Sequence, residues 1–293
     1  MTVRFGDSSW LLWPDAAGIP PDAPDFVSKD GGPSLDSDIL DVHRPRIYAF
    51  RAGNPNGRAA LVLAGGGYTK LVASYEGVDV ARWLNGLGFH AFLLVHRFPQ
   101  IRWADGHHNG SQPPLDDAIE AMRQIRARAA EFALRPNGLG VFGLSSGGHL
   151  AASLAASYPP DWRPRASRHA RLPHRPDFMV IGYAPISTNA TGRTLLAQKP
   201  PLPPPEKQAL YEALQPDAQL LEDPPPSFLV YSAADAVVPV ENAWRLAAAL
   251  RARGGIAELH VYAQGAHGFA LRESTLPIGE WPAACARWLA TLD

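Results

Sequence analysis

Apolar runs and amphipathic stretches alternate along most of this chain, and that alternation limits its fold more than any other feature. The apolar runs have the length of buried strands, and strands are predicted at residues 60–64, 91–95, 139–142, 178–183, 227–232 and 257–262. Between them, apolar residues recur at helical spacing and predict helices at residues 75–87, 113–133, 147–157, 240–253 and 279–291. Strands that alternate with helices form parallel β-α-β units. The sequence therefore predicts an α/β fold, with a mostly parallel, doubly wound sheet and helices on both faces.

The first part of the chain does not follow this pattern. Residues 1–45 are rich in Pro, Asp and Gly, and we expect an irregular N-terminal arm with no more than one strand. Residues 46–51 (RIYAFR) alternate in polarity and predict an edge strand. The turn sequence NPNG at 54–57 then predicts a hairpin between this strand and the strand at 60–64.

Two later segments also interrupt the alternation. Residues 159–177 carry five arginines among prolines and are predicted to form a solvated loop. Residues 190–226 are rich in proline and predict a small cap insertion with one short helix near 205–214. This insertion is too short to fold alone, so we expect a single domain over residues 1–293.

Charge and cysteine content exclude several classes of protein. The formal net charge is −1, so no field directs the chain to nucleic acid or to a membrane surface. Cys285 is the only cysteine, and the histidines show no metal-binding spacing, so we expect no metal and no cofactor. The N-terminus lacks the pattern of a signal peptide and no apolar run could span a membrane, which predicts a cytoplasmic protein. The composition does not distinguish a monomer from a homo-oligomer.

The motif GLSSG, residues 143–147, directly follows a predicted strand and directly precedes a predicted helix. This is the setting that a G-x-S-x-G nucleophile requires, because a sharp turn there projects the serine hydroxyl from the edge of the sheet. Gly143 and Gly147 are small because the turn brings backbone segments close together. Ser145 is therefore the predicted nucleophile.

A serine hydroxyl needs a base, and in this arrangement the acid and the histidine follow the serine in the chain. Asp235 lies just beyond the strand at 227–232, at the same edge of the sheet as Ser145. Asp223 precedes that strand and so lies at the opposite end. His267 follows the last strand, between Gly265 and Gly268. We predict Asp235 and His267 as the partners of Ser145.

Three consecutive glycines, residues 65–67, follow the strand at 60–64. Glycine allows positive φ and a close approach of backbone to a ligand, which both phosphate loops and oxyanion holes require. A phosphate loop would have G-x-x-x-x-G-K-[ST], but here Thr69 and Lys70 stand in inverted order at the wrong spacing. We therefore predict an oxyanion hole, with one N–H donor from Gly66 or Gly67 and the other from Ser146.

These motifs together resemble the α/β-hydrolase superfamily. Within it, the chain is similar to the lipase and carbohydrate-esterase branch, which includes acetyl xylan esterases, enzymes related to feruloyl esterases and hormone-sensitive-lipase-like esterases. The matching segments are AGGGYTKL, VARWLNGLGFHAFLLVHRFP, PPLDDAIEAMRQIRARA, VFGLSSGGHLAA, SAADAVVPVENA and GAHGF, in the family's order over residues 58–290. The resemblance implies a catalytic triad of Ser145, Asp235 and His267, with short acyl esters on sugars as substrates.

Two positions depart from the pattern of that superfamily. Ala64 stands where the hormone-sensitive-lipase-like pattern His-Gly-Gly-Gly has its histidine, which favours the carbohydrate branch. His96-Arg97 replaces the usual Tyr-Arg, and whether His96 supports the oxyanion loop stays open.

Three aromatic residues on predicted loops are candidates for substrate binding, namely Tyr68, Trp103 and Trp162. Their rings could stack on a sugar, and packing of the cap is the alternative interpretation.

Three functional hypotheses follow from the sequence. The first is a serine carboxylesterase that removes short acyl groups, foremost acetyl, from xylan-type or other oligosaccharides through an acyl-enzyme. The second keeps the same residues in an amidase, formamidase or peptidase. The third is a non-catalytic ligand-binding protein on a hydrolase fold, which a complete Ser, Asp and His set in the right order disfavours.

Overall fold

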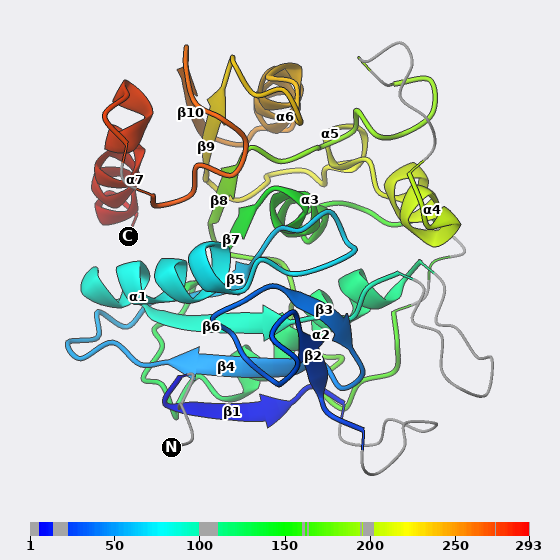
Figure 1. Ribbon diagram of the computed structural model, residues 1–293. Helices are drawn as coiled ribbons and strands as arrows, with labels where there is room; N and C mark the ends of the chain where they lie inside the picture. The colour runs from blue at the N-terminus through cyan, green and yellow to red at the C-terminus, as the bar shows by residue number, and fades with distance from the viewer. Residues whose placement is uncertain are drawn as a thin grey trace.

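An eight-stranded sheet organises the protein (Figure 1). The computed structural model describes residues 6–13, 23–99, 111–159, 162, 164–193, 195, 202–272 and 274–292. In sheet order the strands are β1 (Ser8–Leu11), β4 (Arg46–Phe50), β6 (His90–Val95), β5 (Ala59–Leu63), β7 (Leu139–Leu144), β8 (Met179–Gly182), β9 (Ser227–Ser232) and β10 (Ala257–Tyr262). From β6 to β10 all neighbours are parallel, whereas β4 is antiparallel to both β6 and β1. The predicted mostly parallel sheet is confirmed.

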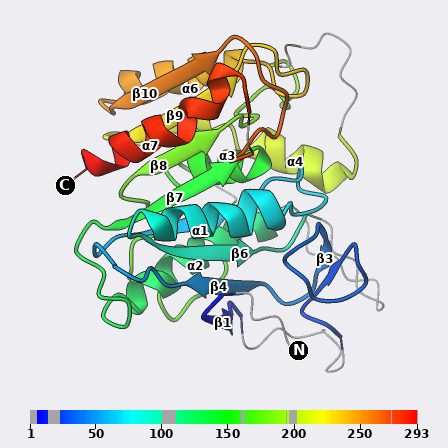
Figure 2. The ribbon, with the colours of Figure 1, turned by 60° about the vertical axis from the view of Figure 1, so that its left-hand side comes forward.

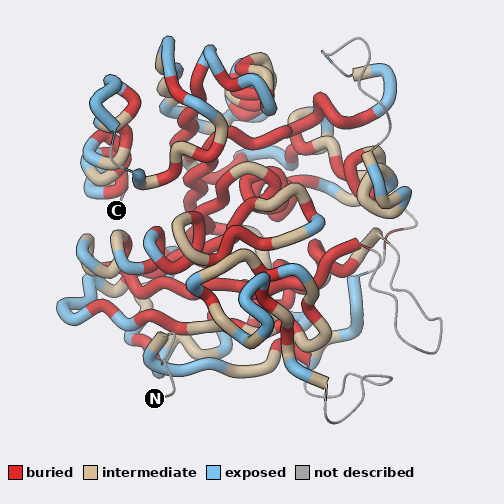
Figure 3. Tube along the Cα trace, in the orientation of Figure 1, coloured by how far each residue is buried: buried red, intermediate tan, exposed pale blue. Residues whose placement is uncertain are grey.

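Helices cover both faces of this sheet, as predicted (Figure 2). Two of them, α1 (Asp79–Gly86) and α7 (Trp281–Ala290), lie on one face. On the other face lie α2 (Pro113–Ala127), α3 (Ser146–Ser153) and α6 (Glu241–Ala252). Every residue of β5 to β9 is buried, because these strands have helices on both sides (Figure 3). No helix in the described ranges is both long and apolar enough to cross a bilayer.

The predicted hairpin between residues 46–51 and 60–64 is wrong. The strand β4 pairs with β6, and β5 lies on the far side of β6, between β6 and β7. All five residues of β5 are buried, and such a strand belongs where helices cover both faces of the sheet. The expectation of an edge strand at 46–51 is also wrong, since β1 pairs along the outer side of β4.

The N-terminal arm contains more strand than expected. Besides β1 it forms a separate two-stranded antiparallel sheet of β2 (Phe26–Ser28) and β3 (Ile39–Val42). Strands of three and four residues among prolines and glycines are too short to give a readable alternation, which is why the sequence did not predict them.

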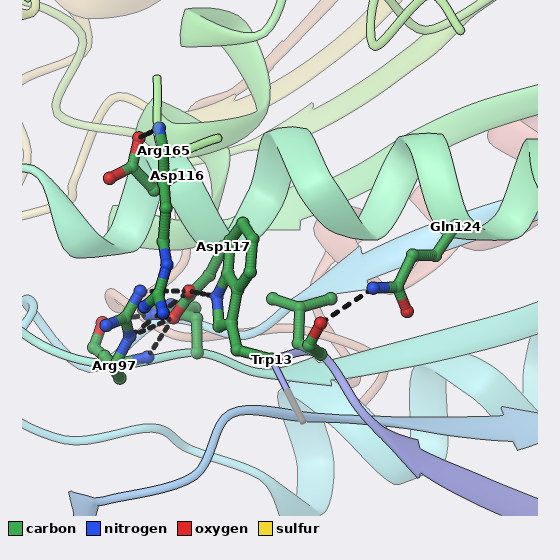
Figure 4. A network of polar contacts seen from close by, with 8 residues as sticks. Trp13, Arg97, Asp116, Asp117, Gln124 and Arg165 are labelled. Carbon is green, nitrogen blue, oxygen red and sulfur yellow. Dashed lines mark hydrogen bonds and ion pairs between the residues drawn. The ribbon is translucent and has the colours of Figure 1, made fainter. Parts of the chain in front are cut away.

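A buried ion pair joins this arm to the sheet and to α2 (Figure 4). The Asp117 carboxylate of α2 accepts hydrogen bonds from the Arg97 guanidinium at 2.6 Å and from the indole N–H of Trp13 at 2.6 Å. In the same region the Gln124 side-chain amide donates to the carbonyl of Leu12 at 2.7 Å. Asp117 is fully buried, so its partners stabilise a charge that would otherwise be costly. Arg97 lies two residues after the end of β6, and the pair therefore fixes the end of that strand against α2.

The cap insertion places its helices beside the carboxyl end of the sheet (Figure 1). Its helix α4 (Pro205–Ala213) agrees closely with the predicted helix near 205–214 and is followed by the short helix α5 (Pro216–Gln219). Parallel sheets of this kind bind ligands at the carboxyl ends of their strands. The insertion is therefore in position to cover a site at that edge.

Candidate active site

Ser145 lies at the sharp turn between β7 and α3, with φ +52° and ψ −126°. Non-glycine residues seldom adopt such a conformation, and it persists only where the surrounding structure enforces it. A Cβ on Gly143 would collide with the carbonyl of Gly147, and one on Gly147 would collide with the carbonyl of Leu63. Both glycines of GLSSG are thus required by close backbone packing, as the sequence predicted.

The structure brings Ser145, His267 and Asp235 together from three different loops. Ser145 Oγ lies 3.0 Å from His267 Nε2, and His267 Nδ1 lies 2.7 Å from Asp235 Oδ2. The Asp235 side chain is 1 % exposed, and its Oδ1 accepts the backbone N–H groups of Val237 at 2.8 Å and Val238 at 2.9 Å. Both carboxylate oxygens of Asp235 therefore accept hydrogen bonds. The imidazole of His267 that Asp235 orients can remove the proton of the Ser145 hydroxyl.

The glycine run lies against this turn. A Cβ placed on Gly65 would stand 2.7 Å from Ser145 Cβ, so no side chain fits there. Gly66 and Gly67 both have positive φ, at +130° and +64°. The predicted need for close approach and for positive φ is met at these positions.

The hydrogen bonds of this loop distinguish its two candidate donors. The N–H of Gly67 donates to Ser146 Oγ at 2.9 Å and is therefore engaged. Among the described residues, the N–H groups of Gly66 and Ser146 have no acceptor. Of the two alternatives left open by the sequence, we therefore favour Gly66 as the donor that acts with Ser146.

A cavity of about 230 Å³ opens beside Ser145. Its walls come from the oxyanion loop, from the loops after β8 and β9, and from the cap insertion. The lining residues are Gly67, Ser145, Pro185, Asn189, Leu202, Lys207, Tyr211, Val237 and Val238. Lys207 and Tyr211 on α4 were missed by the sequence analysis, because only the fold shows which face of this helix meets the site.

The predicted aromatic contacts are not at the cavity wall. Tyr68 is 1 % exposed with φ +60°, and its hydroxyl lies 2.8 Å from His149 Nδ1. Its ring packs at 5.5 Å against the ring of Tyr211, so it supports a wall residue from behind. Trp162 is buried in the core and is not among the lining residues. Trp103 lies outside the described residues.

His149 links the oxyanion loop to the cap. Its Nε2 lies 2.9 Å from the carbonyl of Leu214, and this carbonyl can only accept, so Nε2 carries the proton and Nδ1 accepts from Tyr68. Burial lowers the pKa of His149 to about 4, so the ring is neutral at physiological pH. His96, the residue whose role stayed open, packs its ring 6.2 Å from that of Tyr68 and so also contacts this loop.

Comparison with known proteins agrees with this geometry. The family model for the prolyl oligopeptidase family matches residues 101–291. The chain belongs to that family. Family and geometry together identify an α/β-hydrolase-fold serine hydrolase. Within the described residues no group of three or more His, Cys, Asp or Glu side chains could hold a metal ion.

Two curated relatives act on xylan by name. The chain is 30 % identical over 230 residues to endo-1,4-beta-xylanase B of Butyrivibrio fibrisolvens, which covers 76 % of this chain and 34 % of the relative. It is 27 % identical over 237 residues to an acetylxylan esterase of Xylanibacter ruminicola, covering 79 % of this chain and 45 % of the relative. The chain thus spans less than half the length of either relative.

Solved structures share the fold over most of the chain. An acetyl ester-xyloside bifunctional hydrolase from Caldicellulosiruptor lactoaceticus aligns with a TM-score of 0.73 and 27 % identity, covering 99 % of this chain and 98 % of that one. Esterase 2 of Thermogutta terrifontis aligns with a TM-score of 0.66 and 20 % identity over 84 % of this chain and 89 % of that one, which shows the common fold alone.

Proposed function

We propose that this protein is a serine esterase that removes short acyl groups, foremost acetyl, from xylan-type oligosaccharides through an acyl-enzyme. The observation that carries the proposal is the hydrogen-bonded series Ser145–His267–Asp235 at the wall of a small cavity. A cavity of about 230 Å³ suits a short acyl group better than a long chain. The names of the xylan-related proteins to which the chain is similar support the same substrate class.

In the first half of the reaction Ser145 Oγ attacks the ester carbonyl carbon while His267 Nε2 takes the hydroxyl proton. The imidazolium that forms donates its Nδ1–H to the Asp235 carboxylate, which stabilises the positive charge. The carbonyl oxygen becomes an oxyanion, which the N–H groups of Gly66 and Ser146 stabilise. The C–O bond to the sugar then breaks, and the departing sugar oxygen takes the proton from His267 Nε2.

In the second half water attacks the acyl-enzyme and gives a proton to His267 Nε2. The same two N–H groups stabilise the second oxyanion. When the bond to Ser145 Oγ breaks, His267 returns the proton to the serine, and the short carboxylic acid leaves. The reaction consumes one water and needs no cofactor.

Acetate release from acetylated xylo-oligosaccharides tests the proposal directly. We expect the wild-type protein to release acetate and the variant Ser145→Ala to release none. The parallel substrates are an aryl amide, formylkynurenine and a proline-containing peptide, because the prolyl oligopeptidase family match favours a peptidase as the second candidate. Cleavage of the peptide or of an amide without release of acetate would contradict the esterase proposal and support that alternative.

A further inference from the structure

Glu76 is a buried carboxylate that the proposed reaction does not use. It lies in the π-helical turn Ser74–Val78, directly before α1, and is 2 % exposed. Single π-turns are rare and are frequently found at functional sites. In this turn the preceding residue, Tyr75, is only partly buried, whereas the Glu76 side chain points into the protein.

Both oxygens of this carboxylate accept hydrogen bonds from parts of the site. Oε2 accepts the N–H of Gly65 at 2.8 Å, at the start of the oxyanion loop. Oε1 accepts the hydroxyl of Tyr183 at 2.9 Å. Tyr183 lies just after β8, has φ +39°, and packs its ring edge-on against the His267 ring at 5.1 Å. Glu76 therefore connects the oxyanion loop with Tyr183, whose ring packs against the proposed base, His267.

The same carboxylate lies close to the nucleophile and to the histidine loop. A Cβ placed on Gly65 would stand 2.5 Å from Glu76 Oε2 and 2.7 Å from Ser145 Cβ, so both groups lie on one side of this glycine. A Cβ placed on Gly268, which follows His267, would stand 3.9 Å from Glu76 Oε1. Asp235 thus contacts the imidazole at Nδ1, and Glu76 lies beside the glycine that follows His267.

An ionised carboxylate at this depth is costly unless a positive charge offsets it. Within the described residues Glu76 has no ion-pair partner. Arg272 interacts electrostatically with Glu76, but its guanidinium lies over the ring of Tyr75 at 3.7 Å. Burial raises the pKa of Glu76, while its two hydrogen bonds and the charges of His267 and Arg272 act to lower it. The one positive charge that forms next to it during the reaction is the imidazolium of His267.

We propose that Glu76 is a second, positioning carboxylate of this site, which holds the oxyanion loop and the Tyr183 wall in place and stabilises the His267 imidazolium. This inference rests on the proposed role of His267 as the base, but on no particular substrate. Asp235 orients the ring through a direct hydrogen bond, whereas Glu76 acts through Gly65, Tyr183 and its charge. Among the described residues, Tyr75 and Arg272 also interact electrostatically with Glu76, in addition to His267 and Tyr183.

The variant Glu76→Gln tests the charge while keeping the shape. Glutamine can still accept from Gly65 and pair with Tyr183, so only the negative charge is lost. We expect the pKa of His267 to fall by about one unit, since a nearby anion favours the imidazolium. Carbon NMR of histidine-labelled protein, assigned with His267→Gln, measures this pKa. The rate at which a fluorophosphonate labels Ser145 should fall at neutral pH by at most about tenfold, the factor that one unit represents when the proton is fully transferred to His267 in the transition state.

Thermal unfolding separates this role from a merely structural one. The folded-state pKa of Glu76 lies above its unfolded value, so ionisation at neutral pH lowers the stability of the fold. Glu76→Gln should therefore unfold at the same temperature as the wild type or higher at pH 7. The matched control is Glu120→Gln, which neutralises another buried carboxylate, on α2, and should leave the pKa of His267 unchanged.

A Glu76→Gln protein that loses thermal stability while the His267 pKa stays constant would overturn the inference. If that variant does not fold, Tyr183→Phe serves instead, because it keeps the ring beside His267 and removes one donor to Glu76. Losing the donor disfavours the ionised form of Glu76, so the acid limb of the labelling profile, which reports protonation of His267, should move to lower pH as in Glu76→Gln, and an unmoved limb would also overturn the inference. A protein that deacetylates no sugar but shows the predicted His267 shift would contradict the proposed function and leave this inference standing.

Discussion

The two walls of the candidate cavity are built in different ways. The sheet wall presents Ser145 and Gly67 to the cavity, and His267 and Asp235 adjoin Ser145 from the turns that follow β10 and β9. The cap wall consists of side chains from the proline-rich insertion, chiefly Leu202, Lys207 and Tyr211. On the sheet wall backbone conformation fixes the reacting groups, whereas the residues of the cap wall hold none of the reacting groups.

This difference assigns separate tasks to the two walls. The groups of the sheet wall stabilise charge that develops in the transition state, so substitutions of these groups should lower kcat. The cap wall touches substrate in the same way before and during reaction, so its changes should appear in KM. The first four of the following variants each test one side of this division, in order of decreasing effect.

Replacing the nucleophile should have the largest effect. Ser145→Ala keeps the Cβ and removes the attacking oxygen, so kcat on a short aryl ester should fall on the order of 10⁴- to 10⁶-fold. Unfolding temperature should be unchanged within a few degrees, and the exposed serine variant Ser157→Ala should be fully active. A Ser145→Ala protein with a tenth of wild-type activity would show that the reaction does not use this serine.

The acid of the triad comes next. Asp235→Asn is nearly isosteric, but it favours the wrong imidazole tautomer and removes the charge that stabilises the imidazolium, so kcat should fall by roughly 10⁴. The control is Asp223→Asn, since Asp223 precedes β9 and lies at the opposite edge of the sheet. Equal activity in the two variants would refute the role of Asp235.

The oxyanion loop should show a smaller loss. In Gly66→Val the side chain would collide with the backbone of Lys70 and strain a residue at φ +130°, which displaces the N–H donor. Losing one such donor costs roughly 3 to 4 kcal/mol of transition-state stabilisation, seen mainly in kcat. Gly53→Val is the control, because a Cβ there meets nothing within 4 Å. Wild-type kcat in a folded Gly66→Val protein would mean that Gly66 is not the donor.

A change on the cap wall should act on binding. In Lys207→Met the stem is kept and the ammonium is lost, so we expect KM for acetylated xylo-oligosaccharides to change less than about tenfold while kcat stays near its original value. The exposed lysine variant Lys29→Met should alter neither constant. A large loss of kcat in Lys207→Met would break the division, because it would place a cap residue in the transition state.

The last prediction concerns a titrating group outside both walls. Asp116, near the start of α2, has its pKa raised from 3.8 to about 6 chiefly by burial, and it accepts the backbone N–H of Arg165. Its folded-state pKa is above the unfolded value, so the fold loses stability as pH rises from about 4 to about 6. Asp116→Asn should therefore gain about 1 to 2 kcal/mol at pH 7, and nothing at pH 4, in denaturant titrations. No gain at pH 7 would contradict this, and activity should not change.

Much of the sheet wall could be predicted from sequence because its signals are local. The motif GLSSG lies within a few residues of the strand and helix that frame it, and the close contact between Gly143 and Gly147 lies within that turn. Asp235 and His267 are distant in sequence, but both follow predicted strands, and parallel strands bring their carboxyl ends to one edge.

Other features depended on contacts that no local pattern encodes. The hairpin was mispredicted because strand order is decided by which strands can be buried on both faces, and not by which are adjacent in the chain. Tyr68 follows the glycines and looked available for substrate, yet its positive φ and its bond to His149 bury it. The choice between Gly66 and Gly67 depends on one side-chain oxygen, that of Ser146.

The sequence by itself determined the fold class and the nature of the reacting groups, because strand periodicity, turn glycines and the order of serine, acid and histidine are properties of short segments. Only the tertiary structure decided which N–H is free, which face of α4 meets the cavity, and that Glu76 lies behind the nucleophile. Each of these depends on packing between segments far apart in the chain, where distances of a few tenths of an ångström decide what is donated and what is buried.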